Sequence, residues 1–121
     1  MAPGMDFEVS IGEHARDYCV VSVRGEVDLH TAPKVQYSIE RAAENGATAV
    51  FVDMSGIAFM DSTALSTFMR AKDTLEKQGL TFRLVAPSPA VDRIFDVTGF
   101  RDYFEVFSSL DEASRKDAAS R

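Results

Sequence analysis

The sequence predicts an α/β fold: a mixed β-sheet with an opening hairpin, followed by β-α units whose helices pack against the sheet. Three observations lead to this class. Apolar and polar residues alternate near the start of the chain, longer apolar runs follow, and segments with helical spacing of apolar residues separate those runs. Right-handed crossovers between successive β-α units would make the later strands largely parallel.

The opening hairpin is expected from two short strands. In residues 6–11, apolar and polar side chains alternate, which is the pattern of a half-buried strand. Residues 12–17 predict a turn, and the apolar segment 18–24 predicts the second strand.

The middle of the chain alternates between helix and strand. Apolar residues at helical spacing predict a helix over residues 32–45, with Thr31 as its N-cap and Pro33 in its first turn. The continuous apolar run 48–54 predicts a strand covered on both faces, with a loop after it. A second helix is expected over residues 63–78.

The last third of the chain repeats this alternation in shorter pieces. A strand is predicted over residues 80–86 and a short helix from Pro89, ended by Gly99. A final strand is expected over residues 103–107, and Leu110 begins a terminal helix.

One domain is expected over residues 6–113, because no linker-like segment interrupts it, with flexible ends at 1–5 and 114–121. Apolar residues of the predicted strands and helices should form its core. The expected buried residues are Val50, Phe51, Val52, Leu65, Phe68, Leu84 and Ile94.

Composition limits the classes of partner. The 121 residues carry a net charge of −6, and no run of Lys and Arg is present. An acidic chain repels phosphate backbones and anionic lipids, so no direct nucleic-acid or membrane partner is expected. The N-terminal sequence lacks a signal-peptide pattern, and no apolar run approaches the roughly 20 residues of a membrane span. A cytoplasmic protein is therefore expected.

The residues needed for most enzyme chemistry are absent. Phosphate-cradling glycine motifs and the Gly-x-Ser-x-Gly elbow do not occur. The two histidines, His14 and His30, are expected to be solvated loop residues, and with the single Cys19 they lack metal-ligand spacing. Cys19 is interpreted as a small buried hydrophobe, with a reactive thiol as the alternative. We therefore expect no catalytic residue, no metal site and no cofactor.

One phosphate-accepting alternative is a receiver domain. Asp53 follows the apolar strand 50–52, as the phospho-accepting aspartate of a receiver follows its strand. The acidic pair that would hold Mg²⁺ and the lysine of such a site have no counterparts here, so this interpretation is disfavoured.

The informative segment is the start of the second predicted helix, where Asp61 and Ser62 follow a buried strand. In one interpretation, Asp61 or Ser62 is an ordinary N-cap that accepts the first free amide hydrogens. In the other, Ser62 is a modification site, because a phosphoryl group at a helix start meets free N–H groups and the positive end of the helix dipole. The residues alone leave both interpretations open.

Three stretches resemble the anti-sigma-factor antagonist family, also called STAS domains. The run Phe59-Met60-Asp61-Ser62-Thr63-Ala64-Leu65 looks like the family signature. Residues 25–28 with 31–33 resemble a second landmark, and residues 88–91 with 93–100 resemble a third. The three occur in order and at family spacing, so the resemblance implies a single STAS-like domain.

The resemblance implies a binding protein that is not an enzyme. Ser62 matches the serine that is phosphorylated by an anti-sigma factor with serine kinase activity, and Thr63 is a secondary candidate. Asp28 matches an acidic residue implicated in partner contact, and Asp61 would help to position the Ser62 hydroxyl. The unphosphorylated antagonist would bind the anti-sigma factor and release the sigma factor. A PP2C-type phosphatase would reverse the phosphorylation.

The sequence departs from the family at Ala64, where glycine is usual. Alanine improves helix propensity, and its methyl group is expected to add to the partner-binding surface. This departure bears on partner identity and kinase efficiency more than on the fold. The alternative function is a STAS scaffold or ligand-binding module without a serine switch, and the intact Ser62 favours the switched antagonist.

Overall fold

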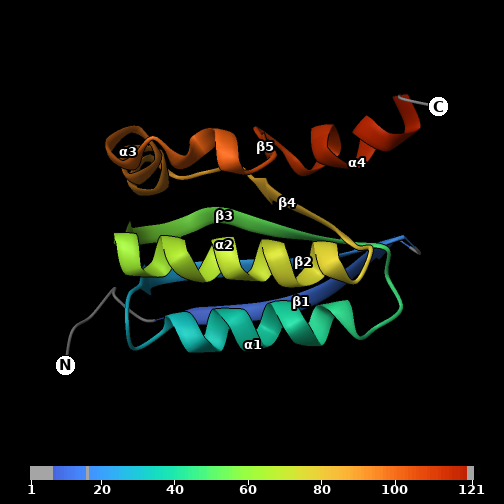
Figure 1. Ribbon diagram of the computed structural model, residues 1–121, viewed down its shortest axis with the longest axis horizontal. Coiled ribbons are helices and arrows are strands. Elements are labelled where there is room, and N and C mark those ends of the chain that lie inside the picture. Colours follow the sequence, from blue (N-terminus) through green and yellow to red (C-terminus); the bar gives the residue numbers. More distant parts are fainter. Residues whose placement is uncertain (1–6, 16, 120–121) are drawn as a thin grey trace.

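A computed structural model describes residues 7–15 and 17–119, and it confirms a mixed α/β fold (Figure 1). Its sheet has the order β1-β2-β3-β4-β5, with β1 antiparallel to β2 and the later neighbours parallel. The strands are β1 (Glu8–Ala15), β2 (Tyr18–Val27), β3 (Ala49–Met60), β4 (Thr81–Val85) and β5 (Val106–Phe107). The helices are α1 (Ala32–Ala43), α2 (Ser62–Lys77), α3 (Pro89–Thr98) and α4 (Leu110–Ala119), with a 3-10 turn at Phe100–Tyr103.

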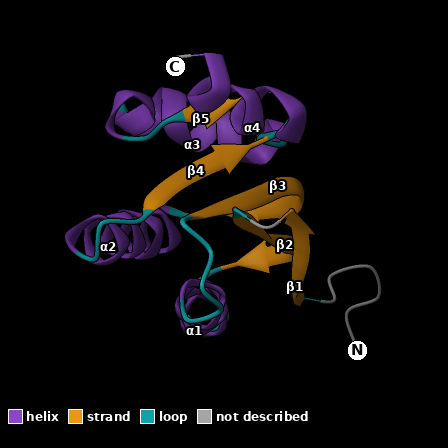
Figure 2. Cartoon of the chain, turned by 90° about the vertical axis from the view of Figure 1, so that its right-hand side faces the viewer, coloured by secondary structure: helices purple, strands orange, loops and turns teal. Residues whose placement is uncertain are grey.

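The main core lies between the sheet and the pair α1 and α2, which run side by side on one of its faces (Figures 1 and 2). Inward residues of α2 such as Leu65 and Phe68 meet Val50, Val52 and Leu84 of the central strands. All five were expected to be buried, and all are. Ile94 is only partly buried at the edge of this core.

The opposite face of the sheet carries a smaller core under α4. Phe51, also buried as expected, packs there with Ala113 of α4. Arg83 of β4 is buried on this face, where its Nε donates to Glu105 Oε1 at 2.7 Å and its guanidinium also donates to the Ala113 carbonyl at 3.0 Å. A buried guanidinium needs such partners, so these contacts tie α4 to the sheet.

The ends of several elements differ from the sequence prediction. The turn expected over residues 12–17 is shorter, because hairpin pairing continues through a bulge to Ala15 opposite Tyr18. The strand expected over residues 103–107 keeps only its last two residues, since Gly99 ends α3 in a left-handed conformation and a 3-10 turn follows. The terminal helix continues to Ala119, within the segment 114–121 that was expected to be flexible. The expectation for residues 1–5 lies outside the described chain.

The loop expected after residue 54 is instead the second half of β3. The strand continues to Met60, and β2 pairs with it as far as Val27. Two shifts of register accommodate extra residues on β3, and each is a β-bulge. A Cβ added at Gly56 would lie 2.7 Å from the Cβ of Arg24, so only glycine fits at the first bulge.

Candidate functional site

Two acidic residues from the sequence prediction meet at one edge of the sheet. Val27 and Met60 are the last paired residues of the parallel strands β2 and β3. Asp28 and Asp61 follow them directly, so both leave the sheet at the same edge from strands about 4.8 Å apart. Ser62 is the next residue of the chain, and it belongs to this edge too.

Asp61 is the N-cap of α2. Its backbone is extended, and its Oδ1 accepts a hydrogen bond from the Ala64 amide at 2.9 Å. Ser62 is the first residue of the helix, it is exposed, and its hydroxyl makes no hydrogen bond within the described chain. The structure therefore gives the capping role to Asp61 and leaves the Ser62 hydroxyl accessible.

The neighbouring residues Thr63 and Ala64 point in different directions. Thr63 is exposed beside Ser62. Ala64 is completely buried in the main core together with Leu65 and Phe68. The expectation that the Ala64 methyl group adds to a partner surface is therefore wrong, because the third residue of α2 lies on the inward side of the helix.

Asp28 holds together the loop that begins α1. Its Oδ1 accepts hydrogen bonds from the amides of His30 at 2.9 Å and Thr31 at 3.2 Å. These two amides, that of His30 first, hold the pKa of the Asp28 carboxyl below its usual value of 3.8. Thr31 does not cap α1 with its side chain; its hydroxyl donates to the Glu26 carbonyl at 2.8 Å and accepts from the Asp28 amide.

Asp28 thus has a structural role at the start of α1 in addition to the partner contact that the resemblance implies. Its Oδ2 makes no hydrogen bond within the part of the chain that the structure describes. One oxygen of the carboxylate stabilises the loop, and the other remains free for an external contact.

Two exposed apolar side chains lie in the segments next to Asp28 and Asp61, and the sequence reasoning missed them. Leu29 is 67% exposed in the loop after β2, and Phe59 is 46% exposed near the end of β3. Beside Phe59, a hollow of about 380 Å³ opens between the end of β3 and α3. An apolar residue inside the polar stretch Asp28-Leu29-His30 was a signal for such exposure, but the hollow depends on a contact between distant segments.

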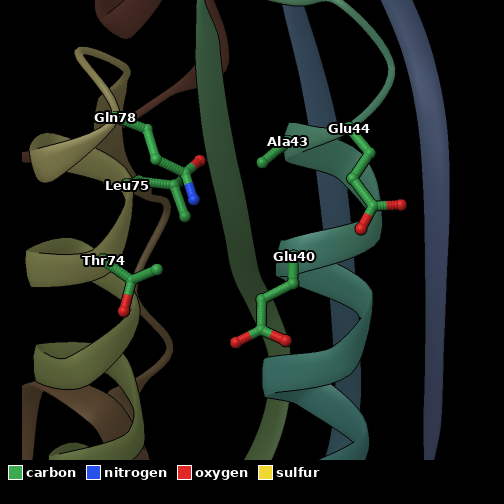
Figure 3. Close-up of a pocket in the computed structure, with 6 residues that line it drawn as sticks. All are labelled: Glu40, Ala43, Glu44, Thr74, Leu75 and Gln78. Carbon is green, nitrogen blue, oxygen red and sulfur yellow. The ribbon is translucent and has the colours of Figure 1, made fainter.

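A second hollow, of about 440 Å³, lies between the C-terminal ends of α1 and α2 (Figure 3). Glu40 and Gln78 extend into the space between the two helices. The nearest residue of α2 that lines this hollow, Thr74, is 12 residues beyond Ser62, which corresponds to about 18 Å along the helix. The hollow is lined by Glu40, Ala43, Glu44, Thr74, Leu75 and Gln78 and is not part of the candidate site.

Other chemistry considered from the sequence finds little support at the described residues. They contain no cluster of three or more His, Cys, Asp or Glu residues that could hold a metal ion. Cys19 is buried in β2, in line with a small buried hydrophobe. Asp53, the counterpart of a receiver aspartate, lies within β3, paired with β2 and β4, instead of at a strand end. His30 is exposed, whereas the side chain of His14 lies outside the description.

None of the described helices is long and apolar enough to cross a membrane. The candidate site consists of an exposed hydroxyl at a helix start and two carboxylates at a sheet edge, with exposed apolar side chains in the flanking segments. These features define a small α/β recognition domain.

Comparison with known proteins shows the family to which this domain belongs. Residues 9–113 match the family model of the STAS domain. The chain is 30% identical over 102 residues to the anti-sigma-B factor antagonist of Listeria monocytogenes, covering 84% of this chain and 90% of that protein. It is 29% identical over 102 residues to the anti-sigma-B factor antagonist of Bacillus subtilis, with 84% and 92% covered.

The fold agrees with the same comparison. A crystal structure of an anti-sigma factor antagonist from Mycobacterium paratuberculosis superposes with a TM-score of 0.80 at 28% identity, over 93% of this chain and 95% of that one. The chain belongs to the STAS domain family. The resemblance drawn from the three sequence landmarks is confirmed.

Proposed function

We propose that this chain is an anti-sigma factor antagonist that acts by binding an anti-sigma factor, which then releases its sigma factor. The observation that carries the proposal is the exposed, unbonded hydroxyl of Ser62 at the start of α2, at the edge that also holds Asp28 and Asp61. Relatives that align over most of their length are anti-sigma-B factor antagonists, which supports the same function. The protein would be a cytoplasmic regulator that needs no cofactor.

The proposed switch is phosphorylation of Ser62 by an anti-sigma factor with serine kinase activity. The Ser62 oxygen would attack the γ-phosphorus of ATP, so that a new O–P bond forms as the bond to the departing ADP breaks. The hydroxyl proton would pass to a base of the kinase. A PP2C-type phosphatase would hydrolyse the phosphoserine and restore the hydroxyl.

Electrostatics explain how phosphorylation would prevent binding without unfolding the domain. A phosphate adds about −1.5 to −2 charges at pH 7, next to the carboxylates of Asp61 and Asp28. The positive end of the α2 dipole offsets part of this charge, typically by about 0.3–1 kcal/mol. A partner surface that fits a neutral hydroxyl between two carboxylates would instead be repelled.

A capture experiment tests the proposal. Wild type, Ser62→Ala and Ser62→Asp would be used to bind proteins from the native organism, with Ser109→Asp as a matched control. Ser109 is exposed just before α4, on the opposite face of the sheet, and its hydroxyl accepts a hydrogen bond from the Glu112 amide, a capping role that Asp can keep. The control therefore adds the same charge at a helix start outside the proposed site. We expect an anti-sigma factor of the ATPase fold on all variants except Ser62→Asp, whose affinity should fall at least tenfold.

Phosphate mapping by mass spectrometry gives the second readout. Incubation with the captured kinase and ATP should place phosphate on Ser62. Phosphate on the exposed Thr63 alone would move the site by one residue and keep the mechanism. Phosphate on neither residue, from a kinase active on another antagonist, would contradict the switch and favour the STAS scaffold or ligand-binding module.

A further inference from the structure

The hollow beside Phe59 is lined by the residues of β3 that directly precede the proposed switch. It is formed by the end of β3 and the first turns of α3, and its volume is about 380 Å³. The β3 residues that line it, 58–60, lead directly into Asp61 and Ser62. Its lining consists of Ala58, Phe59, Met60, Pro89, Ala90, Arg93 and Ile94.

A buried hydrogen bond fixes the two walls of this hollow relative to each other. Ser88, the N-cap of α3, is buried, and its hydroxyl donates to the Ile57 carbonyl at 2.6 Å. Ile57 directly precedes the second bulge of β3, where Ala58 is the extra residue. The bulge and the cap therefore hold α3 against β3 with the hollow already open.

The outer side of α3 extends the apolar lining of the hollow. Ala90, Ile94 and Val97 follow one another at spacings of four and three residues, so they lie on the same side of the helix. Val97 is 76% exposed. Ala90 and Ile94 are partly buried. An exposed apolar side chain next to a partly buried apolar stripe and a hollow is typical of a surface that binds another protein.

Arg93 supplies the charge at this surface. It lines the hollow, it is exposed, and it makes no ion pair or hydrogen bond with any residue of the described chain. The nearby Arg101 differs, because it pairs with both Asp92 and Asp96. In a chain with net charge −6, an unpaired cation beside an apolar hollow is complementary to a carboxylate next to an apolar side chain.

We propose that this hollow is the docking site for the anti-sigma factor, which inserts an apolar side chain here and pairs a neighbouring carboxylate with Arg93. The proposal rests on the proposed function and adds a second contact region to it. Binding then has two parts: the hollow binds the anti-sigma factor, and the phosphorylation state of Ser62 determines whether the anti-sigma factor can also contact the edge of the sheet.

Two substitutions test the docking site without disturbing the core. Arg93→Glu reverses the charge of an exposed side chain. Ala90→Asp puts a carboxylate into the hollow, and an acidic residue in the first turn of α3 is compatible with the helix dipole. Arg115→Glu is the control, because it makes the same charge reversal on α4, which covers the opposite face of the sheet. It also breaks the exposed pair of Arg115 with Asp111, and such surface pairs contribute only about 0–1 kcal/mol to stability.

Affinity would be measured by titration calorimetry against each purified ATPase-fold anti-sigma factor of the native organism, after thermal melts show that every variant is folded. We expect Arg93→Glu and Ala90→Asp to bind at least tenfold more weakly than wild type, and Arg115→Glu to bind within about twofold of it. A variant of the anti-sigma factor in which Lys replaces the carboxylate that pairs with Arg93 should bind Arg93→Glu again.

Three results would overturn the proposal. If both hollow variants bind like Arg115→Glu while Ser62→Asp does not bind, the antagonist function stands and the docking site is wrong. If wild type binds none of the anti-sigma factors, both proposals fail. If wild type sediments as a dimer that Arg93→Glu dissociates, the hollow belongs to a second copy of the chain.

Discussion

The capping role of Asp61 leads to a sharp test of the site, because the sequence allowed either Asp61 or Ser62 to cap α2. Asp61→Ala removes the acceptor of the 2.9 Å hydrogen bond from the Ala64 amide. Ser62→Ala removes a hydroxyl that is exposed and unbonded within the described chain. Asp61→Ala should therefore destabilise the domain, whereas Ser62→Ala should leave its stability almost unchanged.

The size of the Asp61 effect follows from two contributions. Loss of an N-cap side chain typically costs about 1 kcal/mol, and loss of a carboxylate near a helix start adds about 0.3–1 kcal/mol. Together they give about 1–2 kcal/mol. For 121 residues, an unfolding entropy of about 2.1 cal/mol/K per residue turns this into a Tm decrease of about 4–8 °C. Ser62→Ala should change stability by less than about 0.5 kcal/mol.

Urea and thermal unfolding followed by circular dichroism at 222 nm would measure both variants. Asp61→Asn is the control that keeps an acceptor oxygen, so it should recover most of the loss. A cost above about 1 kcal/mol for Ser62→Ala, with Asp61→Ala near wild type, would make Ser62 the cap. Its hydroxyl would then be occupied, and the basis of the proposed switch would be refuted.

Two further predictions concern the bulge and the loop that form the site. Gly56→Ala should destabilise the domain by about 1–3 kcal/mol in urea unfolding, because its Cβ would clash with Arg24. Gly12→Ala is the control and should be close to neutral, because the atom nearest to its Cβ would be 4.0 Å away. Equal effects of the two substitutions would contradict the bulge geometry. Because hydrogen bonds lower the pKa of Asp28 in the folded state, its stabilising contribution is complete above pH 3.8 and is lost as pH falls through the lowered pKa. Wild type should therefore lose more stability than Asp28→Asn between pH 5 and about pH 2 in acid unfolding, and parallel curves would argue against the loop contacts.

Periodicity predicted the order of the elements but not the length of β3. Its second half contains Ser55 and Gly56, which are typical of loops, and its two bulges break the two-residue alternation of a strand. What makes this segment a strand is its pairing with β2, a contact between distant parts of the chain. Sequence patterns carry no direct signal for such pairing.

The site was predicted in part. The motif identified Asp28, Asp61 and Ser62, and the structure brings them to one edge. The inward position of Ala64 could have been found, since it precedes Phe68 by four residues and so shares its buried side of α2. The hollow at α3 could not, because it depends on packing between separate elements.

The parallel pairing of β2 with β3 also determines what an enzyme acting on Ser62 would recognise. Asp28 is far from Ser62 in the sequence and lies at the same edge of the sheet only because the two strands end together. A short linear peptide around Ser62 would contain neither Asp28 nor the hollow-lining residues of α3. An enzyme with this selectivity would recognise the folded surface around Ser62 and not a consensus sequence. Peptide libraries would therefore underestimate its selectivity for this protein, and a misfolded copy of the chain would not be a substrate.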